Sequence, residues 1–289
     1  MNTVNAVVQG VLLGGLYALV AAGLSLVFGV MRIVNLAHGV LAVLAAYGSL
    51  LLGEHLGWNP FLSLLVVVPA MAALGYALQR ALLDRALRGG ELAPLLVTFG
   101  LAIVIQNLLL ETFSADTQRL DVGAFGGASI ELTDGLAIGW FPLLAAAAGV
   151  LVIAGLGQFL ARTRTGRAMR ATSDDQEAAQ LMGIDNRRLY AVATAIALGT
   201  VAIAGVFLGS RSTFDPSAGA TTLIFAFEAV VIGGLGSLWG TLLGGVVLGV
   251  AQGLGAAIDP AYGVLAGHLV FLAVLAVRPR GLLPSAVTA

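Results

Sequence analysis

The residues of this chain that could do chemistry are few, and the most concentrated group lies between Arg162 and Arg188. This segment reads RTRTGRAMRATSDDQEAAQLMGIDNRR and holds six of the fourteen arginines. Ser173 and Gln176 have the spacing of a capping box, in which the serine hydroxyl accepts a hydrogen bond from the backbone N–H of residue 176 and the glutamine reaches back. The pattern predicts a short helix over residues 174–182, stopped by the glycine that follows.

Such a helix is too short to be stable alone in water, so it must pack against something. Its small apolar face consists of Ala178, Leu181 and Met182. One alternative is that this face packs back onto the rest of the chain. The other is that it docks on a partner protein, and physical arguments alone do not separate the two.

Glu228 is the only carboxylate that the sequence places well inside an apolar run, TTLIFAFEAVVIGG. Ionisable residues within membrane spans are costly and are candidates for function. Glu228 is therefore expected either to line a path through the membrane and meet a positively charged group there, or to be protonated or to tie two helices together by a hydrogen bond.

Two breaks between apolar runs also carry candidate path residues. Asn35 and His38 lie in RIVNLAHG and are expected near the end of the first span, either lining or gating a path or capping the start of the second span. Gly233, Gly234 and Gly236 interrupt a later run, and backbone groups freed at such breaks often bind substrate in transporters.

The composition shows which elements must position these residues. The chain is 59% hydrophobic and 10% charged, with a mean hydropathy of +0.99, whereas soluble domains carry about 25% charged residues. An integral membrane protein is indicated. There is no lysine, which excludes a phosphate-binding loop of the G-x-x-x-x-G-K-[ST] type, and no cysteine, which excludes thiolate metal sites and disulfides.

Apolar runs predict an all-α, polytopic bundle of about eight or nine transmembrane helices that forms a single transmembrane domain over residues 1–289. Helices are required because lipid cannot satisfy free backbone groups. The first run is expected to be a retained span and the seventh, which is short, to be complete or re-entrant. The predicted spans cover residues 6–30, 36–53, 61–79, 92–110, 139–160, 189–210, 222–236, 239–257 and 263–277.

The arginines also predict an orientation. If the loop at about 161–188 is cytoplasmic, alternation places twelve of the fourteen arginines inside, as the positive-inside rule requires, and leaves Arg119 and Arg211 outside. The acidic loop at about 111–138, which includes Asp134, is then external. The N-terminus is expected outside and the C-terminus in the cytoplasm.

Glycines four residues apart recur within the spans, as at Gly10 and Gly14 and again at Gly245, Gly249 and Gly253. Small residues at this spacing let helix backbones approach closely in a membrane. Close packing between these helices is therefore expected.

Three blocks of sequence resemble one family. The run from Glu177 to Gly183, EAAQLMG, looks like the cytoplasmic coupling motif of ABC importer permeases. The block from Gly15 to Gly39 and the block from Glu228 to Gly245 resemble the branched-chain amino acid permeases of the Liv-type high-affinity family. The resemblance covers nearly the whole chain and is weakest over residues 113–138.

The resemblance implies an assembly that imports branched-chain or related amino acids. It would contain a second related permease subunit, two cytoplasmic ATP-binding subunits that hold ATP and magnesium, and an external substrate-binding protein, in a bacterial or archaeal cytoplasmic (inner) membrane. This chain would bind no cofactor and catalyse no reaction. The residues expected to contact the ATPase are Glu177, Ala178, Ala179, Leu181, Met182 and Gly183.

Alternatives remain open at this point. Permeases for urea and short amides resemble the same family closely. An ion-coupled secondary transporter would need a chain of ionisable groups within the membrane, and the spans offer little beyond Glu228. A membrane-embedded enzyme is disfavoured because the sequence has neither a G-x-S-x-G nor an H-E-x-x-H motif.

Overall fold

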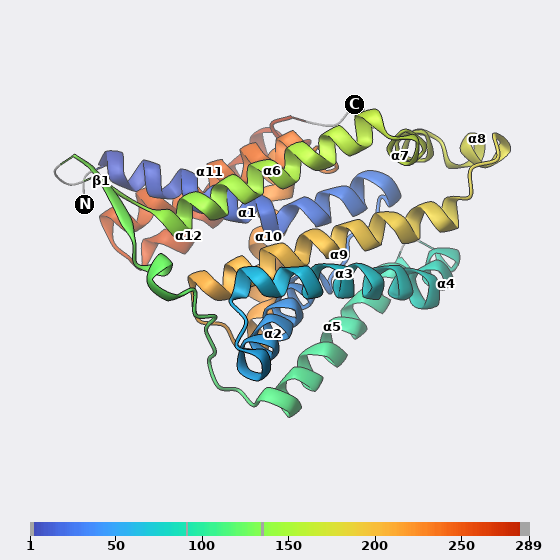
Figure 1. Cartoon of the computed structure of the whole chain (residues 1–289). Coiled ribbons are helices and arrows are strands. Elements are labelled where there is room, and N and C mark those ends of the chain that lie inside the picture. Colours follow the sequence, from blue (N-terminus) through green and yellow to red (C-terminus); the bar gives the residue numbers. More distant parts are fainter. Residues whose placement is uncertain (1–2, 91, 134–135, 284–289) are drawn as a thin grey trace.

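The computed structural model describes residues 3–90, 92–133 and 136–283, and these form a bundle of long helices (Figure 1). Each of the nine predicted spans corresponds to a helix. The long helices are α1 (Thr3–Met31), α2 (His38–Leu56), α3 (Pro60–Leu78), α5 (Leu92–Phe113), α6 (Trp140–Arg162), α9 (Asn186–Arg211), α10 (Gly219–Gly233), α11 (Leu238–Ile258) and α12 (Tyr262–Val277).

Shorter elements connect them. A π-helical turn (Gln79–Leu83), α4 (Asp84–Ala86) and a 3-10 turn (Leu87–Gly89) continue α3, and further 3-10 turns cover Gly123–Gly126 and Pro216–Ala218. The helices α7 (Arg164–Asp174) and α8 (Gln176–Leu181) lie between α6 and α9. Two strands, β1 (Ser129–Thr133) and β2 (Leu136–Gly139), pair in antiparallel fashion.

The prediction of a helical membrane bundle is confirmed. Within the described residues, eight helices are long and apolar enough to cross a membrane, and α12 is a shorter apolar helix of 16 residues. The uncertain seventh span is an unbroken helix from Gly219 to Gly233, extended at its start by the turn Pro216–Ala218.

The strand pair is a difference from the all-α prediction. Ile130 lies opposite Ile138 in a loop that is too short and too polar to be detected as a span. Asp134, one of the acidic residues expected in this loop, lies outside the described residues.

Helix α1 is the central element, and it packs against α11 through glycines. A Cβ atom at Gly14 would lie 2.5 Å from Cα of Val246, and one at Gly249 would lie 2.3 Å from the carbonyl oxygen of Gly10. Any side chain at these positions would push the two helices apart. The expected close packing of small residues is therefore confirmed for α1 and α11.

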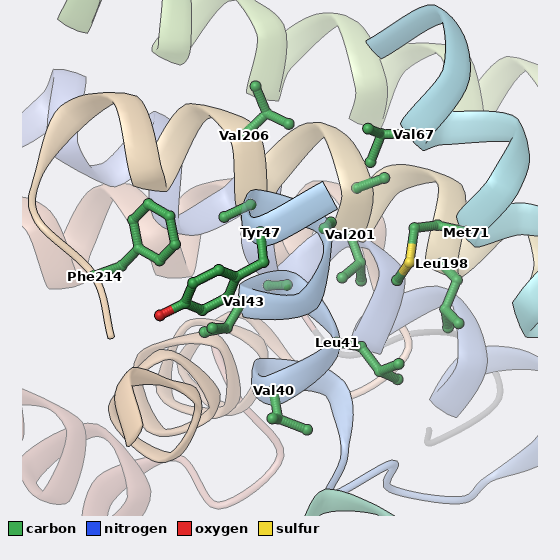
Figure 2. Packing of buried hydrophobic residues seen from close by; sticks show 14 of the residues in the cluster. Val40, Leu41, Val43, Tyr47, Val67, Met71, Leu198, Val201, Val206 and Phe214 are labelled. Carbon is green, nitrogen blue, oxygen red and sulfur yellow. The ribbon is translucent and has the colours of Figure 1, made fainter. Parts of the chain in front are cut away.

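A second apolar cluster joins α2 to α3 and α9 (Figure 2). The ring of Tyr47 stacks on Phe113 with 4.3 Å between centroids and meets the edge of Phe214 at 5.0 Å. Figure 2 shows Phe214 on the segment that follows α9, with its ring turned toward Tyr47. This contact holds the end of α9 against α2.

The beginning of α2 lies deeper than the sequence indicated. Residues 32–37 turn back from the end of α1, and Nε2 of His38 lies 2.7 Å from the carbonyl oxygen of Val20, in the middle of α1. Asn35 and His38 are only 4% and 1% exposed. The expected position near the end of the first span is wrong for His38, because the connection folds into the bundle.

The arginine-rich segments gather at the end of the bundle that carries α7 and α8, here called the α8 end (Figure 1). Nη2 of Arg32 donates to the carbonyl of Ser173 at 3.1 Å, and Nε of Arg187 lies 3.6 Å from a carboxylate oxygen of Asp84. These contacts place three segments that alternation assigned to one side of the membrane at the same end of the molecule.

Candidate functional site

The segment before α8 is a helix and not a loop. Thr163 caps it by accepting the N–H of Gly166 at 2.9 Å, and the helix α7 continues to Asp174. The predicted capping box is therefore wrong, because Ser173 is inside α7. Asp175 caps α8 instead: its Oδ1 accepts the N–H groups of Glu177 at 2.9 Å and Ala178 at 3.0 Å. Helix α8 is thus six residues long, shorter than the predicted 174–182.

The apolar face of α8 points away from the bundle. Leu181 is 89% exposed and Met182 is 83% exposed, whereas Ala179 on the opposite side is buried. Gly183 ends the segment with a φ of +83°, as its position predicted. The alternative in which Leu181 and Met182 pack back onto the chain is not what the structure shows, and both are available to a partner.

Hydrogen bonds connect the α7–α8 junction rigidly to two long helices. The Ser173 hydroxyl donates to the carbonyl of Gly29 in α1. Nδ2 of Asn186, at the start of α9, donates to the carbonyl of Gln176 at 3.1 Å, and the Gln176 amide also bonds to the hydroxyl of Tyr190. A displacement of α8 would therefore pull on both α1 and α9.

A third connection runs from α9 to the continuation of α3. The side chain of Asp84 is 1% exposed and accepts Nε2 of Gln79 at 3.0 Å, while Arg80 and Arg187 lie 3.4 and 3.6 Å from its other oxygen. Oε1 of Gln79 in turn accepts the hydroxyl of Thr194 at 2.8 Å. Asp84 is the centre of a buried polar network that holds the α8 ends of α3 and α9 together.

Glu228 is paired within the protein. Its Oε1 lies 2.5 Å from Nδ1 of His268 on α12, and the residue is 3% exposed. The neighbouring helices carry a second polar pair, in which the Tyr17 hydroxyl donates to Oε1 of Gln252 at 2.6 Å. The geometry supports the interpretation of Glu228 as a tie between α10 and α12.

The glycine break after α10 is closed by the C-terminal segment. Gly234 and Gly236 have φ values of +113° and +79°, which end the helix. The carbonyl groups of Ile232 and Gly233 accept the N–H groups of Leu282 and Leu283, each at 2.9 Å. Direct contact of Gly233, Gly234 or Gly236 with a substrate stays a prediction.

Two cavities enter the bundle from different sides. One, of about 760 Å³ at the α8 end, is lined by Val34 and by the α7–α8 junction. The other, of about 430 Å³, lies between α1, α10 and the residues after α9, and Val20 is part of its wall. Residues 34–38 run from the first wall to the second, because Val34 lines one cavity and His38 bonds to Val20 of the other.

Two hydrogen bonds fix the position of this segment. Oδ1 of Asn35 accepts the N–H of Ala37 at 3.0 Å within the turn before α2. Ala37 directly precedes α2 and no side chain caps this helix, so the alternative in which Asn35 caps the start of the second span is not what the structure shows. The N–H of Leu36 donates to the hydroxyl of Thr98 on α5 at 3.1 Å. The structure does not gather the six predicted path residues into one site: Asn35 and His38 lie between these two cavities, and Gly236 lines a third cavity of about 360 Å³.

Comparison with protein families decides the class of this bundle. Residues 6–275 match the model of the branched-chain amino acid transport system permease component. The chain belongs to this family.

Several permeases are similar to more than nine-tenths of this chain. The chain is 34% identical to the high-affinity branched-chain amino acid transport system permease protein BraD of Pseudomonas aeruginosa, over 96% of this chain and 94% of the relative. It is 29% identical to LivH of Escherichia coli K12, over 95% and 93%. It is also 26% identical to LivM of the same strain, over 93% of this chain and 68% of that protein.

Four residues whose hydrogen bonds join helices in this permease were not predicted from the sequence: Asp84, Asn186, His268 and Tyr17. Asp84 and Asn186 lie beyond the ends of apolar runs in the sequence, where polar residues are common, yet each is only 5% exposed in the structure. His268 stands in a run of otherwise apolar residues, and an isolated histidine opposite an isolated glutamate was a signal that could have paired it with Glu228.

Proposed function

We propose that this permease is the membrane subunit of an ABC importer, which carries branched-chain amino acids inward and is driven by separate ATP-binding subunits. The observation that carries the proposal is the exposed face of α8. A six-residue helix with Leu181 and the following Met182 exposed to water is unstable alone, and the junction between α7 and α8 is fixed to α1 and α9 by hydrogen bonds. Both features suit a helix that sits in a groove of a partner and transmits its movement.

The residues that contact the ATPase in this proposal are Glu177, Ala178, Leu181, Met182 and Gly183. Ala179 has a different role from the others, because it is buried against the rest of the chain. It anchors α8 while its neighbours face the partner. ATP and magnesium are bound by the partner subunits, and this chain supplies no catalytic group.

The names of the relatives support the choice of substrate. BraD and LivH, which match over more than nine-tenths of this chain, are named as branched-chain amino acid permeases. Import of leucine, isoleucine or valine is therefore preferred to import of urea or short amides. An ion-coupled mechanism has less support, since Glu228 is engaged with His268.

The remaining subunits complete the assembly. Two E. coli permease proteins, LivH and LivM, are both similar to this chain, which supports pairing with a second, related permease. A binding protein would deliver the amino acid from outside. Under the arginine rule, the α8 end faces the cytoplasm of the bacterial or archaeal inner membrane.

This orientation has a direct test. Ala171 is exposed on α7, and the chain has no native cysteine. A cysteine introduced as Ala171→Cys is expected to react with a membrane-impermeant thiol reagent only after the cells are opened. Labelling of intact cells from outside would reverse the proposed topology.

Transport itself is tested in proteoliposomes that contain the complete transporter and its binding protein. We expect uptake of radiolabelled leucine that requires ATP on the α8 side and is not replaced by an ion gradient. Urea should neither be taken up nor compete. Uptake driven by an ion gradient without ATP would contradict the proposal.

A further inference from the structure

The cavity of about 430 Å³ lies at the end of the molecule opposite α8, where α9 ends and the turn Pro216–Ala218 leads into α10. We call it the Arg211 cavity. It extends along α1 from Leu13 to Val20. It therefore reaches from the end of α9 to Val20, whose carbonyl oxygen is hydrogen-bonded to His38. His38 belongs to the segment that lies between the two cavities.

One half of the Arg211 cavity is charged and polar. Among the described residues that line it, Arg211 is the only cation and Asp215 the only anion. Within the part of the chain that the structure covers, the guanidinium of Arg211 has no hydrogen bond or ion pair. Oδ1 of Asp215 accepts the N–H of Ser217 at 2.7 Å, which fixes the carboxylate at the start of the turn.

The other half is apolar. Leu13, Leu16 and Phe214 line it, and the rings of Tyr17 and Phe225 lie 5.1 Å apart in its wall. Phe214 is held in place by the ring of Tyr47 (Figure 2). Small-molecule sites commonly combine such a preformed apolar surface with a few convergent polar groups.

We propose that the Arg211 cavity binds a zwitterionic amino acid with an apolar side chain, with Arg211 taking the carboxylate and Asp215 the ammonium group. This inference rests on the proposed function and names the site in this chain that first receives the substrate. A guanidinium presents paired N–H donors that match a carboxylate. The aliphatic side chain would lie against Leu16 and Phe225.

The charges of Arg211 and Asp215 indicate which class of ligand fits the cavity. One cation and one anion in the same cavity compensate a zwitterion, whereas an amine or a carboxylic acid would leave one protein charge unpaired. The larger cavity at the α8 end has a different balance, since Arg32 is there accompanied by Asp174 and Asp175. That cavity therefore lacks the one-to-one balance of positive and negative side chains that a zwitterionic amino acid requires.

The test uses the complete transporter and needs neither ATP nor the binding protein. Thr221 is exposed and lines the Arg211 cavity. Because the chain has no native cysteine, a cysteine introduced at this position is the only thiol of the chain. In a Thr221→Cys protein, saturating L-leucine is expected to slow labelling by a maleimide at least fivefold. Leucinamide, which lacks the carboxylate, and 4-methylpentanoate, which lacks the ammonium group, should give no protection at the same concentration.

Substitutions then assign the two charges. Arg211→Gln and Asp215→Asn should each abolish protection by leucine, and Arg211→Lys should retain part of it. The matched control is Arg119→Gln, which neutralises the other arginine that the topology places outside and should leave protection unchanged. A cysteine at the exposed Thr117, which does not line the cavity, should react at the same rate with or without leucine.

The outcomes separate this inference from the proposed function. If the unsubstituted transporter imports leucine but leucine does not slow labelling of Thr221→Cys, the Arg211 cavity is not the receiving site. Equal protection by leucine and leucinamide would also overturn the proposal. If protection is present but ATP-driven uptake of leucine is absent, the site stands and the importer assignment fails.

Discussion

The hydroxyl of Ser173, in the last turn of α7, donates a hydrogen bond to the carbonyl of Gly29, close to the end of α1. Arg32 completes the connection by donating to the carbonyl of the same serine at 3.1 Å. Helix α1 also supplies Tyr17 and Val20 to the wall of the Arg211 cavity. One continuous helix therefore joins the exposed α8 segment to the cavity at the far end of the molecule.

Removing the Ser173 hydroxyl should weaken this connection. A typical hydrogen bond contributes about 1 kcal/mol, which corresponds to roughly a fivefold change in an equilibrium. We expect Ser173→Ala to lower the leucine transported per ATP hydrolysed several-fold while ATP hydrolysis continues. The measurement is uptake and hydrolysis in the same proteoliposomes.

A control for Ser173→Ala is available in the same helix. Thr165 is partly exposed, and within the described residues its hydroxyl makes no side-chain hydrogen bond. Thr165→Ala should leave the ratio of transport to hydrolysis unchanged. An equal loss in both variants would mean that the contact with Gly29 does not transmit movement.

Asp84 should be more important for stability than the arginines that surround it. Asp84→Ala leaves the buried amide of Gln79 without its acceptor, at a cost of about 1–3 kcal/mol. The side chain of Arg187 is 64% exposed, so Arg187→Ala should cost less than about 1 kcal/mol. Thermal unfolding in detergent should show a clear fall in Tm only for Asp84→Ala. Similar falls would show that the surface ion pair contributes most of the energy.

Replacement of glycine by alanine should have opposite effects at two sites. One is Gly14, in the contact between α1 and α11, and the other is Gly100, on α5. Gly14→Ala forces a methyl group against the backbone of Val246, 2.5 Å from an ideal Cβ, and should sharply reduce the yield of folded protein. A Cβ atom at Gly100 in α5 would have no side chain and no other helix within 4 Å. Gly100→Ala should be neutral or should stabilise the helix by about 0.5–1 kcal/mol. Equal folded yields, measured by size-exclusion chromatography, would contradict the close approach of α1 and α11.

The sequence was most informative where long apolar runs and glycine spacing determine structure. Each of the nine predicted apolar runs coincides with a helix, because lipid leaves helices as the only solution for a long apolar run. The placement of Arg32 and Arg187 at the same end of the molecule followed from alternation of the spans.

The sequence was least informative where a polar side chain has possible hydrogen-bond partners both nearby and far away along the chain. Ser173 fits a local capping box, but its hydroxyl bonds to Gly29, 144 positions away, and Asp175 takes the cap. The fold of residues 32–37 into the bundle was also hidden, because the contact of His38 with Val20 depends on tertiary packing. The pairing of Glu228 with His268 needed the relative placement of α10 and α12.

The tie between Glu228 and His268 predicts coupled effects on stability. Hydrogen bonds to charged groups contribute about 1.5–3 kcal/mol. Glu228→Ala and His268→Ala should therefore each lower the free energy of unfolding, and the double variant should cost clearly less than the sum of the two. Glu228→Gln keeps a hydrogen-bonding side chain and should retain assembly and uptake. Loss of uptake in Glu228→Gln with normal assembly would place this carboxylate in the transport path instead.

The most direct test of the importer account is recovery of an ATP-binding protein with the tagged chain from native membranes. We predict that the unmodified chain and Leu181→Met, which keeps an apolar side chain, both recover the ATPase. Leu181→Glu and Glu177→Arg should lose it while the permease remains folded, because these residues are exposed on α8. Absence of any ATPase with the unmodified chain, or undiminished recovery with Leu181→Glu, would contradict the account.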